Sequence, residues 1–226
     1  MLYSAFGCDI ILFGYSFIFL YAESVSMSKT EIAEKTIAEN GGIAKTAELL
    51  SAGLSKSDIG RLTDSGVIVR IRHGFYRLRS GKHLPEALSI AVMLPDGIVA
   101  VESALFLYGY SDFTPREWSI AVPRSISLGK LKIDVPIKAY FIQRDVYELG
   151  KTAMLVDGIE MNVYDRERTV CDCFKYRSRL DSELFAKAVK AYAADESKDL
   201  GRLARYAKAL GVYKKVKDTM EVLLNG

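Results

Sequence analysis

The hydrophobic positions of residues 28–66 recur at intervals of three and four, which predicts helices separated by glycine turns. The first helix is expected to start at Ser28, which has capping-box spacing to Glu31, and Asn40-Gly41-Gly42 is expected to stop it. Ile43 then begins a short extended link.

Two further helices are predicted from the same pattern. Thr46 is expected to cap the second, "AELLSAG", which ends at Gly53. Ser55 has capping-box spacing to Asp58 and opens the third, which runs to Gly66. Each helix presents one apolar stripe, so the three are expected to share a small core.

Residues 68–79 alternate instead of recurring at helical spacing, which predicts a β-hairpin with its two-residue turn at His73-Gly74. This turn would place residue 72 opposite 75, 71 opposite 76, 70 opposite 77, 69 opposite 78 and 68 opposite 79. One face is then apolar, and the other carries Arg70, Arg72, Arg77 and Arg79. Arginines crowded on one small face repel each other, so an anionic partner is expected.

Helix, helix, glycine turn, helix and basic hairpin is the element order of a winged helix-turn-helix, with the third helix in the major groove and the hairpin as the wing. Arg61 suits guanine edges or phosphate. Asp64, on the same face, argues against such contact unless it points away or accepts from a cytosine amine. Winged helices also bind proteins, and that alternative stays open. The predicted DNA-contacting residues are Thr46, Ser55, Lys56, Ser57, Gly60, Arg61, Arg70, Arg72, His73, Arg77 and Arg79.

A different pattern follows residue 82 and predicts a second, mixed α/β domain, so the fold class is α+β. Helices are expected at residues 85–93 and 99–109. Strands are expected at residues 118–123, 132–142, 151–156 and 159–165, the last two joined as a hairpin at Asp157-Gly158. From Arg166 the chain is expected to be helical to its end, in about four segments broken near Leu180, Ser197 and Gly211.

The length of 226 residues with 50% hydrophobic content supports a small module plus a larger domain. The expected division is an apolar extension at 1–26, a winged helix-turn-helix at 27–82 and a C-terminal domain at 83–226. The net charge of +3 is mild, so local clusters carry the argument for nucleic acid. Three cysteines offer no disulfide framework and indicate reduced thiols in a cytoplasmic protein.

The first 26 residues have three interpretations. A signal peptide lacks basic residues before its apolar run, and a membrane span would be interrupted by Asp9, Gly7 and Gly14. The favoured interpretation is that Met27 is the natural start and that the preceding residues are an upstream extension of the reading frame. No contact with a membrane is expected.

Catalytic chemistry has few candidates. With only His73 and His83 present, a nucleophile would have almost no base available. Cys171 and Cys173 are two apart within a helical segment and do not face each other, so a metal pair is not expected. No glycine-rich phosphate loop is present, and no catalytic residue, metal or cofactor is predicted.

The segment "YDRERTVCD" is the most suggestive polar cluster. A nuclease would use Asp165, Glu167 and Asp172 as metal ligands. The favoured interpretation is structural, with Asp165 as a helix cap, Glu167 at the positive helix end and Arg168 paired with Asp172.

Two other polar features leave alternatives open. Glu102 either bonds locally near the start of an apolar helix or marks a partner site. Cations outnumber carboxylates in the last forty residues, which suggests a second contact with an anion, either DNA or an acidic partner.

The quoted elements together resemble the AbiEi antitoxin family of type IV, abortive-infection toxin-antitoxin systems. The likeness rests on "GGIAKTAELLSAGLSKSDIGRLTDSGVIVRIRHGFYRL", "VAVESALFLYGYSDFTP" with "WSIAVP", and "GIEMNVYDRERTVCDCFKY". It implies a winged helix that binds inverted repeats of double-stranded DNA in its own promoter, and a C-terminal domain that counters a cognate nucleotidyltransferase-like toxin. The family's reading helix falls on residues 55–65 and its wing on residues 70–79.

The main hypothesis is therefore a non-enzymatic antitoxin that represses its own operon. The alternatives are a nucleic-acid-processing enzyme and a transcriptional regulator that responds to a small ligand without a toxin.

Overall fold

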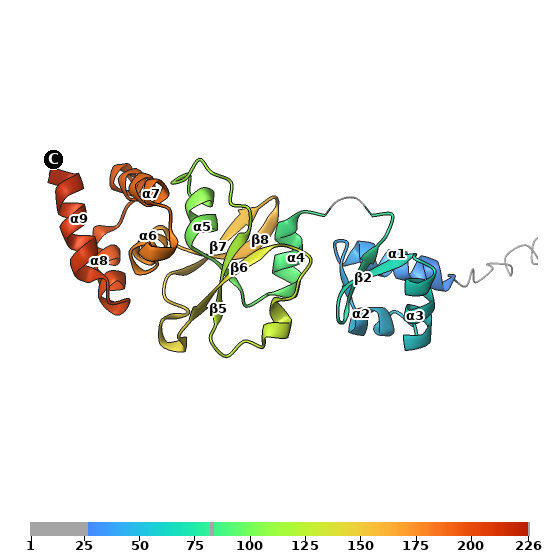
Figure 1. Ribbon diagram of the computed structural model, residues 1–226. Coiled ribbons are helices and arrows are strands. Elements are labelled where there is room, and N and C mark those ends of the chain that lie inside the picture. The colour runs from blue at the N-terminus through green and yellow to red at the C-terminus, as the bar shows by residue number, and fades with distance from the viewer. Residues whose placement is uncertain (1–26, 82–83, 226) are drawn as a thin grey trace, which may run out of the picture.

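The computed structural model describes residues 27–81 and 84–225. The interpretations of residues 1–26, and the basic residues Lys82 and His83, lie outside this part of the chain. Figure 1 shows the N-terminal helices and wing at one end, a sheet in the middle and the last helices at the other end.

The N-terminal unit, residues 28–81, contains helices α1 (Lys29–Glu39), α2 (Thr46–Ser51) and α3 (Lys56–Asp64). Capping boxes at Ser28 and Ser55 start α1 and α3, as the sequence predicts. The residue before α2 is Lys45, so Thr46 is the first residue of that helix and not its cap. Its backbone N–H donates to the carbonyl of Gly74 at 2.9 Å, which joins α2 to the turn of the wing.

The wing is a three-stranded sheet in the order β1-β3-β2, formed by β1 (Ala44–Lys45), β2 (Ile68–Arg72) and β3 (Phe75–Leu78). The predicted register is wrong below Arg72. Arg70 lies opposite Tyr76, and Val69 lies opposite Arg77, because the pairing shifts by one residue between Arg70 and Arg72. An extra residue in one strand turns every following side chain to the other face. Arg70 therefore lies on the face opposite to that of Arg72 and Arg77.

The N-terminal unit has its own hydrophobic core, to which each helix contributes. Buried members include Ile37 of α1, Leu49 of α2, Ile59 of α3 and Ile68 of β2. None of the hydrophobic clusters in the described residues joins this core to the rest of the chain. We therefore propose that residues 28–81 and 84–225 form two structural units.

The second unit contains a five-stranded mixed sheet in the order β6-β5-β4-β8-β7. Its strands are β4 (Ile98–Val99), β5 (Trp118–Pro123), β6 (Ile137–Ile142), β7 (Lys151–Val156) and β8 (Ile159–Tyr164). β5 pairs with β6, and β4 with β8, in parallel, whereas β4–β5 and β7–β8 are antiparallel. Asp157 and Gly158 both have positive φ, which confirms the predicted two-residue hairpin.

Helices α4 (Glu86–Met93) and α5 (Val101–Leu107) pack on this sheet, and α6 to α9 follow it. The last four are α6 (Arg166–Lys175), α7 (Ser182–Ala194), α8 (Leu200–Ala209) and α9 (Tyr213–Asn225), close to the predicted breaks. One core lies between α4, α5 and the sheet, and a larger one joins the sheet to α6–α9. The predicted α+β class, with a winged helix before a mixed domain and a helical end, is confirmed.

No helix within residues 27–81 and 84–225 is long and apolar enough to cross a membrane.

Candidate functional site

The exposed face of α3 carries the residues that the sequence predicts for DNA contact. Lys56, Ser57, Gly60 and Arg61 are all exposed, and Asp64 is exposed beside them. Ile59 and Leu62 are buried on the opposite side. The helix thus turns a small, mostly polar surface to solvent, which is the arrangement that entry into a major groove requires.

The buried Asp58 side chain completes the capping box at the start of α3. Its carboxylate accepts from the backbone N–H of Ser55 at 2.8 Å and from the Ser55 hydroxyl at 2.7 Å. These hydrogen bonds hold the pKa of Asp58 below its ordinary value of 3.8. The other carboxylate oxygen accepts from Arg61 Nη2 at 2.6 Å. Arg61 is therefore anchored through one nitrogen while most of its side chain stays in solvent.

The wing presents its cations on two faces. Arg70 and Arg79 are exposed and Arg77 is half-buried, with its Nη1 donating to the carbonyl of Leu78 at 3.3 Å. None of these three forms an ion pair with a carboxylate of the described residues. His73 is exposed at the turn of the hairpin. The wing therefore carries positive charge that nothing in the N-terminal unit neutralises.

Arg72 lies opposite Phe75, as predicted, and it also reaches the second unit. Its Nη1 donates to the carbonyls of Met93 and Lys130, each at 3.0 Å, and both belong to the second unit. Its guanidinium also lies 4.5 Å from the ring centroid of Phe75. Partial burial lowers its pKa, although an arginine in this setting keeps its charge at neutral pH. Arg72 links the wing to the second unit in addition to any contact with DNA.

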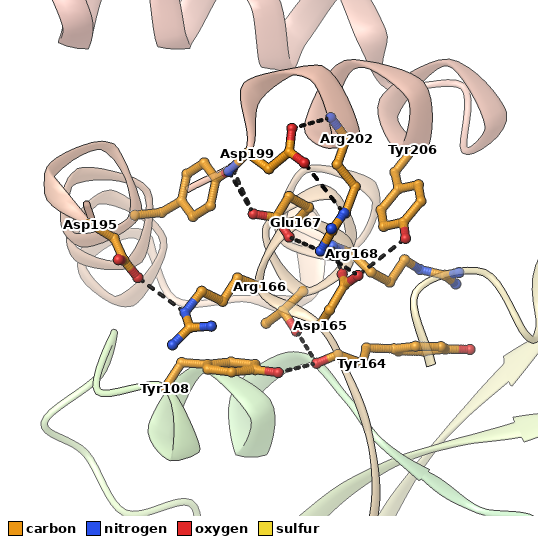
Figure 2. A network of polar contacts seen from close by, with 12 residues as sticks. Tyr108, Tyr164, Asp165, Arg166, Glu167, Arg168, Asp195, Asp199, Arg202 and Tyr206 are labelled. Carbon is orange, nitrogen blue, oxygen red and sulfur yellow. Dashed lines mark hydrogen bonds and ion pairs between the residues drawn. The ribbon is translucent and has the colours of Figure 1, made fainter. Parts of the chain in front are cut away.

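A second set of polar residues surrounds the start of α6 (Figure 2). Asp165 caps the helix by accepting from the backbone N–H of Arg168 at 2.8 Å, as predicted. Its other oxygen accepts from the Tyr206 hydroxyl at 3.1 Å. Glu167 is buried and accepts from the backbone N–H of Asp199 at 2.9 Å. Arg202 reaches from α8 toward both acids, 3.9 Å from Asp165 and 3.6 Å from Glu167.

The predicted pair within α6 is present and lies in the core. Arg168 Nε is 3.1 Å from Asp172 Oδ2, and both residues are 0% exposed. Arg168 Nη1 donates to the carbonyls of Val146 and Leu149. Burial raises the pKa of Asp172, and the guanidinium opposes that shift. The pair ties α6 to the loop before β7.

These contacts support the structural interpretation of "YDRERTVCD" over the nuclease interpretation. Asp172 pairs with Arg168 in the core, whereas Asp165 and Glu167 both lie near Arg202. The described part of the chain contains no group of three acidic, histidine or cysteine side chains that could hold a metal ion. Cys171 and Cys173 are buried, and burial raises the pKa of both thiols. Buried thiols of high pKa are poor nucleophiles.

Glu102, near the start of α5, is bound by side chains of the strands β5 and β6 and not by neighbours along its own helix. Its carboxylate accepts from Lys138 Nζ at 2.6 Å, Ser119 Oγ at 2.7 Å and the Tyr140 hydroxyl at 2.8 Å. Burial acts to raise the pKa of Glu102, but these hydrogen bonds hold it below its usual range. The residue before it, Val101, has a φ of 43°, a strained value for a β-branched side chain.

Sequence reasoning missed the partners of Arg72 and the support that Asp58 gives to Arg61. The Asp58–Arg61 contact had a local signal, because residues three apart on a helix are neighbours. The contacts of Arg72 had no such signal, since the carbonyls of Met93 and Lys130 are 21 and 58 residues away along the chain.

Residues 31–79 match the family model described as "Transcriptional regulator, AbiEi antitoxin". Among solved structures, the chain is similar to the RV2827C protein from Mycobacterium tuberculosis, with a TM-score of 0.57 and 16% identity. That alignment covers 87% of this chain and 80% of the other, and at this identity it supports the fold alone. No curated protein sequence matches the chain. The resemblance to AbiEi antitoxins that the sequence indicates is therefore confirmed over residues 31–79.

Proposed function

We propose that this protein is an antitoxin that binds the promoter DNA of its own operon and represses it. The single observation that carries the DNA-binding half is the pairing of an exposed polar face on α3 with uncompensated arginines on the adjacent wing. The family match over residues 31–79 covers the same elements and describes a transcriptional regulator.

In this proposal α3 enters the major groove. Ser57, Gly60 and Arg61 face the base edges, and Gly60 lets the helix backbone approach closely, because it carries no side chain. Ser55 and Lys56 lie at the helix start, where the backbone N–H groups and the helix dipole favour phosphate. Thr46 lies beside the wing turn and is expected to contact phosphate there.

The wing arginines supply the binding energy that does not depend on sequence. Arg70, Arg77 and Arg79 contact backbone phosphates, and His73 lies at the tip of the wing between the strands. Inverted repeats in the promoter then correspond to two chains, one on each half-site. Arg72 contributes charge near the same backbone while it holds the wing against the second unit.

The second unit is the part that we assign to the cognate nucleotidyltransferase-like toxin. Support for this half comes from the resemblance of the segments "VAVESALFLYGYSDFTP" and "GIEMNVYDRERTVCDCFKY" to AbiEi antitoxins, because the matching family model covers residues 31–79 of the N-terminal unit. We place the protein in the cytoplasm, where both promoter DNA and such a toxin are found. The carboxylates of α6 take part in folding and not in catalysis in this account.

The test uses the full chain and the DNA immediately upstream of its gene, with a scrambled fragment of equal length as the control. Preferential binding of the upstream fragment, and loss of that preference in Arg61→Ala, support the proposal. Equal binding of the two fragments at every salt concentration would contradict it. For the toxin half, co-expression with an adjacent nucleotidyltransferase gene should restore growth, and growth arrest despite stable co-expression argues against the antitoxin role.

A further inference from the structure

A cleft of about 490 Å³ lies between the wing and the second unit. One wall is formed by the wing residues Lys45, Arg72 and Phe75, and the other by the ends of α4 and β5 and the loop that reaches Lys130. Sites for small molecules typically enclose about 300–1,000 Å³. The cleft is large enough for a compact ligand, and such a ligand would contact both units.

The charge of the cleft is unbalanced. Three cations line it, Lys45, Arg72 and Lys130, against one carboxylate, that of the exposed Asp96 at its rim. None of the three cations forms an ion pair with a carboxylate in the part of the chain that the structure describes. Cations gathered around a concave surface raise the local concentration of anions.

Arg72 is already oriented for such a ligand. Its Nη1 donates to the carbonyls of Met93 and Lys130, and its Cζ lies 4.5 Å from the ring centroid of Phe75. No hydrogen bond of Arg72 Nε or Nη2 is found among the described residues. A guanidinium fixed on one side and unused on the other loses little conformational entropy when it binds an anion, and its planar fork suits phosphate.

Apart from Ser125 and Ser127, the remaining lining is apolar, with Phe75, Met93 and Ile126 among its residues. Inorganic phosphate alone would leave this part of the cleft unfilled. We propose that the cleft binds a small phosphate-bearing ligand that also carries an aromatic or apolar group, such as a nucleoside monophosphate. The phosphate contacts Lys45, Arg72 and Lys130, and the apolar group packs against Phe75 and Met93.

The experiment titrates AMP into the full chain by isothermal calorimetry, with inorganic phosphate as the minimal probe. We expect saturable binding of one AMP per chain, and weaker binding of phosphate because it gains no apolar contact. Lys45→Gln and Lys130→Gln should each weaken AMP binding about tenfold, the effect of losing one charged hydrogen bond. Both residues lie in the solvent-accessible lining, so these variants are expected to fold.

Lys132→Gln is the matched control, because Lys132 is exposed two residues from Lys130 and does not line the cleft. It should leave AMP binding unchanged. Absence of saturable AMP binding, or equal weakening by Lys132→Gln, overturns the proposal.

Two further arms separate this site from the DNA surface. The combined variant Arg70→Ala, Arg77→Ala and Arg79→Ala should lose DNA affinity and still bind AMP. If Lys45→Gln and Lys130→Gln weaken binding of duplex DNA while AMP does not bind, the cleft receives backbone phosphate and the small-ligand proposal is wrong. Failure of DNA binding with intact AMP binding would contradict only the proposed repressor.

Discussion

Asp58 and Arg61 form a hydrogen-bonded ion pair on α3, with 2.6 Å between Arg61 Nη2 and Asp58 Oδ1. The acid is buried and also completes the capping box with Ser55, whereas the arginine is exposed. One carboxylate therefore both starts the helix and restrains the side chain that we expect to read DNA. The start of α3 and the orientation of the Arg61 side chain are therefore linked through this pair.

We predict that Asp58→Asn destabilises the N-terminal unit at neutral pH. The folded-state pKa of Asp58 lies below its ordinary value of 3.8, so its stabilising contribution is present above that value and is lost as the pH falls through the folded-state pKa. Thermal unfolding at pH 7 should occur at lower temperature in the variant, and the difference should shrink below about pH 4. A difference that stays constant down to pH 2 would show that the charge of Asp58 contributes little.

Gly60→Ala separates folding from recognition. The glycine lies within α3, and an added Cβ would meet no atom within 4 Å. Helix propensity then predicts stabilisation of about 0.5–1 kcal/mol, measured by chemical denaturation. The same methyl group would come between α3 and the floor of the major groove, so affinity for the upstream DNA should fall. Gain of both stability and affinity would show that this face of α3 does not lie against DNA.

Asp172→Ala tests the structural interpretation of the α6 carboxylates. The substitution leaves the fully buried Arg168 without its ion-pair partner, and such a loss typically costs about 3–5 kcal/mol. We expect a large fall in the free energy of unfolding. Asp199→Ala is the comparison, because that acid caps α8 with a side chain that is 46% exposed, and a helix cap contributes about 1 kcal/mol.

The nuclease alternative makes the opposite prediction for Asp172. A catalytic ligand could be removed without unfolding the protein, and metal-dependent cleavage of nucleic acid would disappear. An intact, stable Asp172→Ala variant that has lost such cleavage would contradict our interpretation of α6.

Arg202→Ala tests whether the contact between α8 and the start of α6 stabilises the protein. Arg202 extends from α8 to Asp165 and Glu167 at the start of α6, as Figure 2 shows, and burial raises the pKa of Asp165. Removal of the guanidinium leaves two neighbouring acids without their shared cation. We expect a loss of about 1–3 kcal/mol in unfolding free energy, and Arg205→Ala on the same helix, which forms no ion pair among the described residues, should change it by less than about 0.5 kcal/mol. Equal effects of the two substitutions would mean that the contacts of Arg202 are not important for stability.

The sequence predicts most of the helices because their signals are local. Capping boxes at Ser28 and Ser55 and the cap at Asp165 stand directly before apolar stripes, and all three helices start there. The β7–β8 hairpin is equally local, since Asp157-Gly158 specifies its turn.

The strand predictions that failed depend on contacts between residues far apart in the sequence, which a short stretch of sequence does not show. β1 and β4 have two residues each and are strands only because distant strands pair with them. β6 begins at Ile137 and not at residue 132, because its partner β5 begins at Trp118. The alternation of residues 68–79 does not show the irregularity between Arg70 and Arg72, so the predicted face with four arginines was wrong. The DNA-contacting residues on α3 and the wing stay predictions.

The salt dependence of DNA binding shows whether the wing arginines contact phosphate. We would measure the affinity of the full chain for its upstream DNA across a salt series, beside the variant Arg70→Ala, Arg77→Ala and Arg79→Ala and the control Lys35→Ala on α1. Each lost phosphate contact should reduce the slope of log affinity against log salt by about 0.9. We therefore predict a distinctly shallower slope and weaker binding for the wing variant alone. Identical slopes and affinities for the wild-type protein and the wing variant would contradict it.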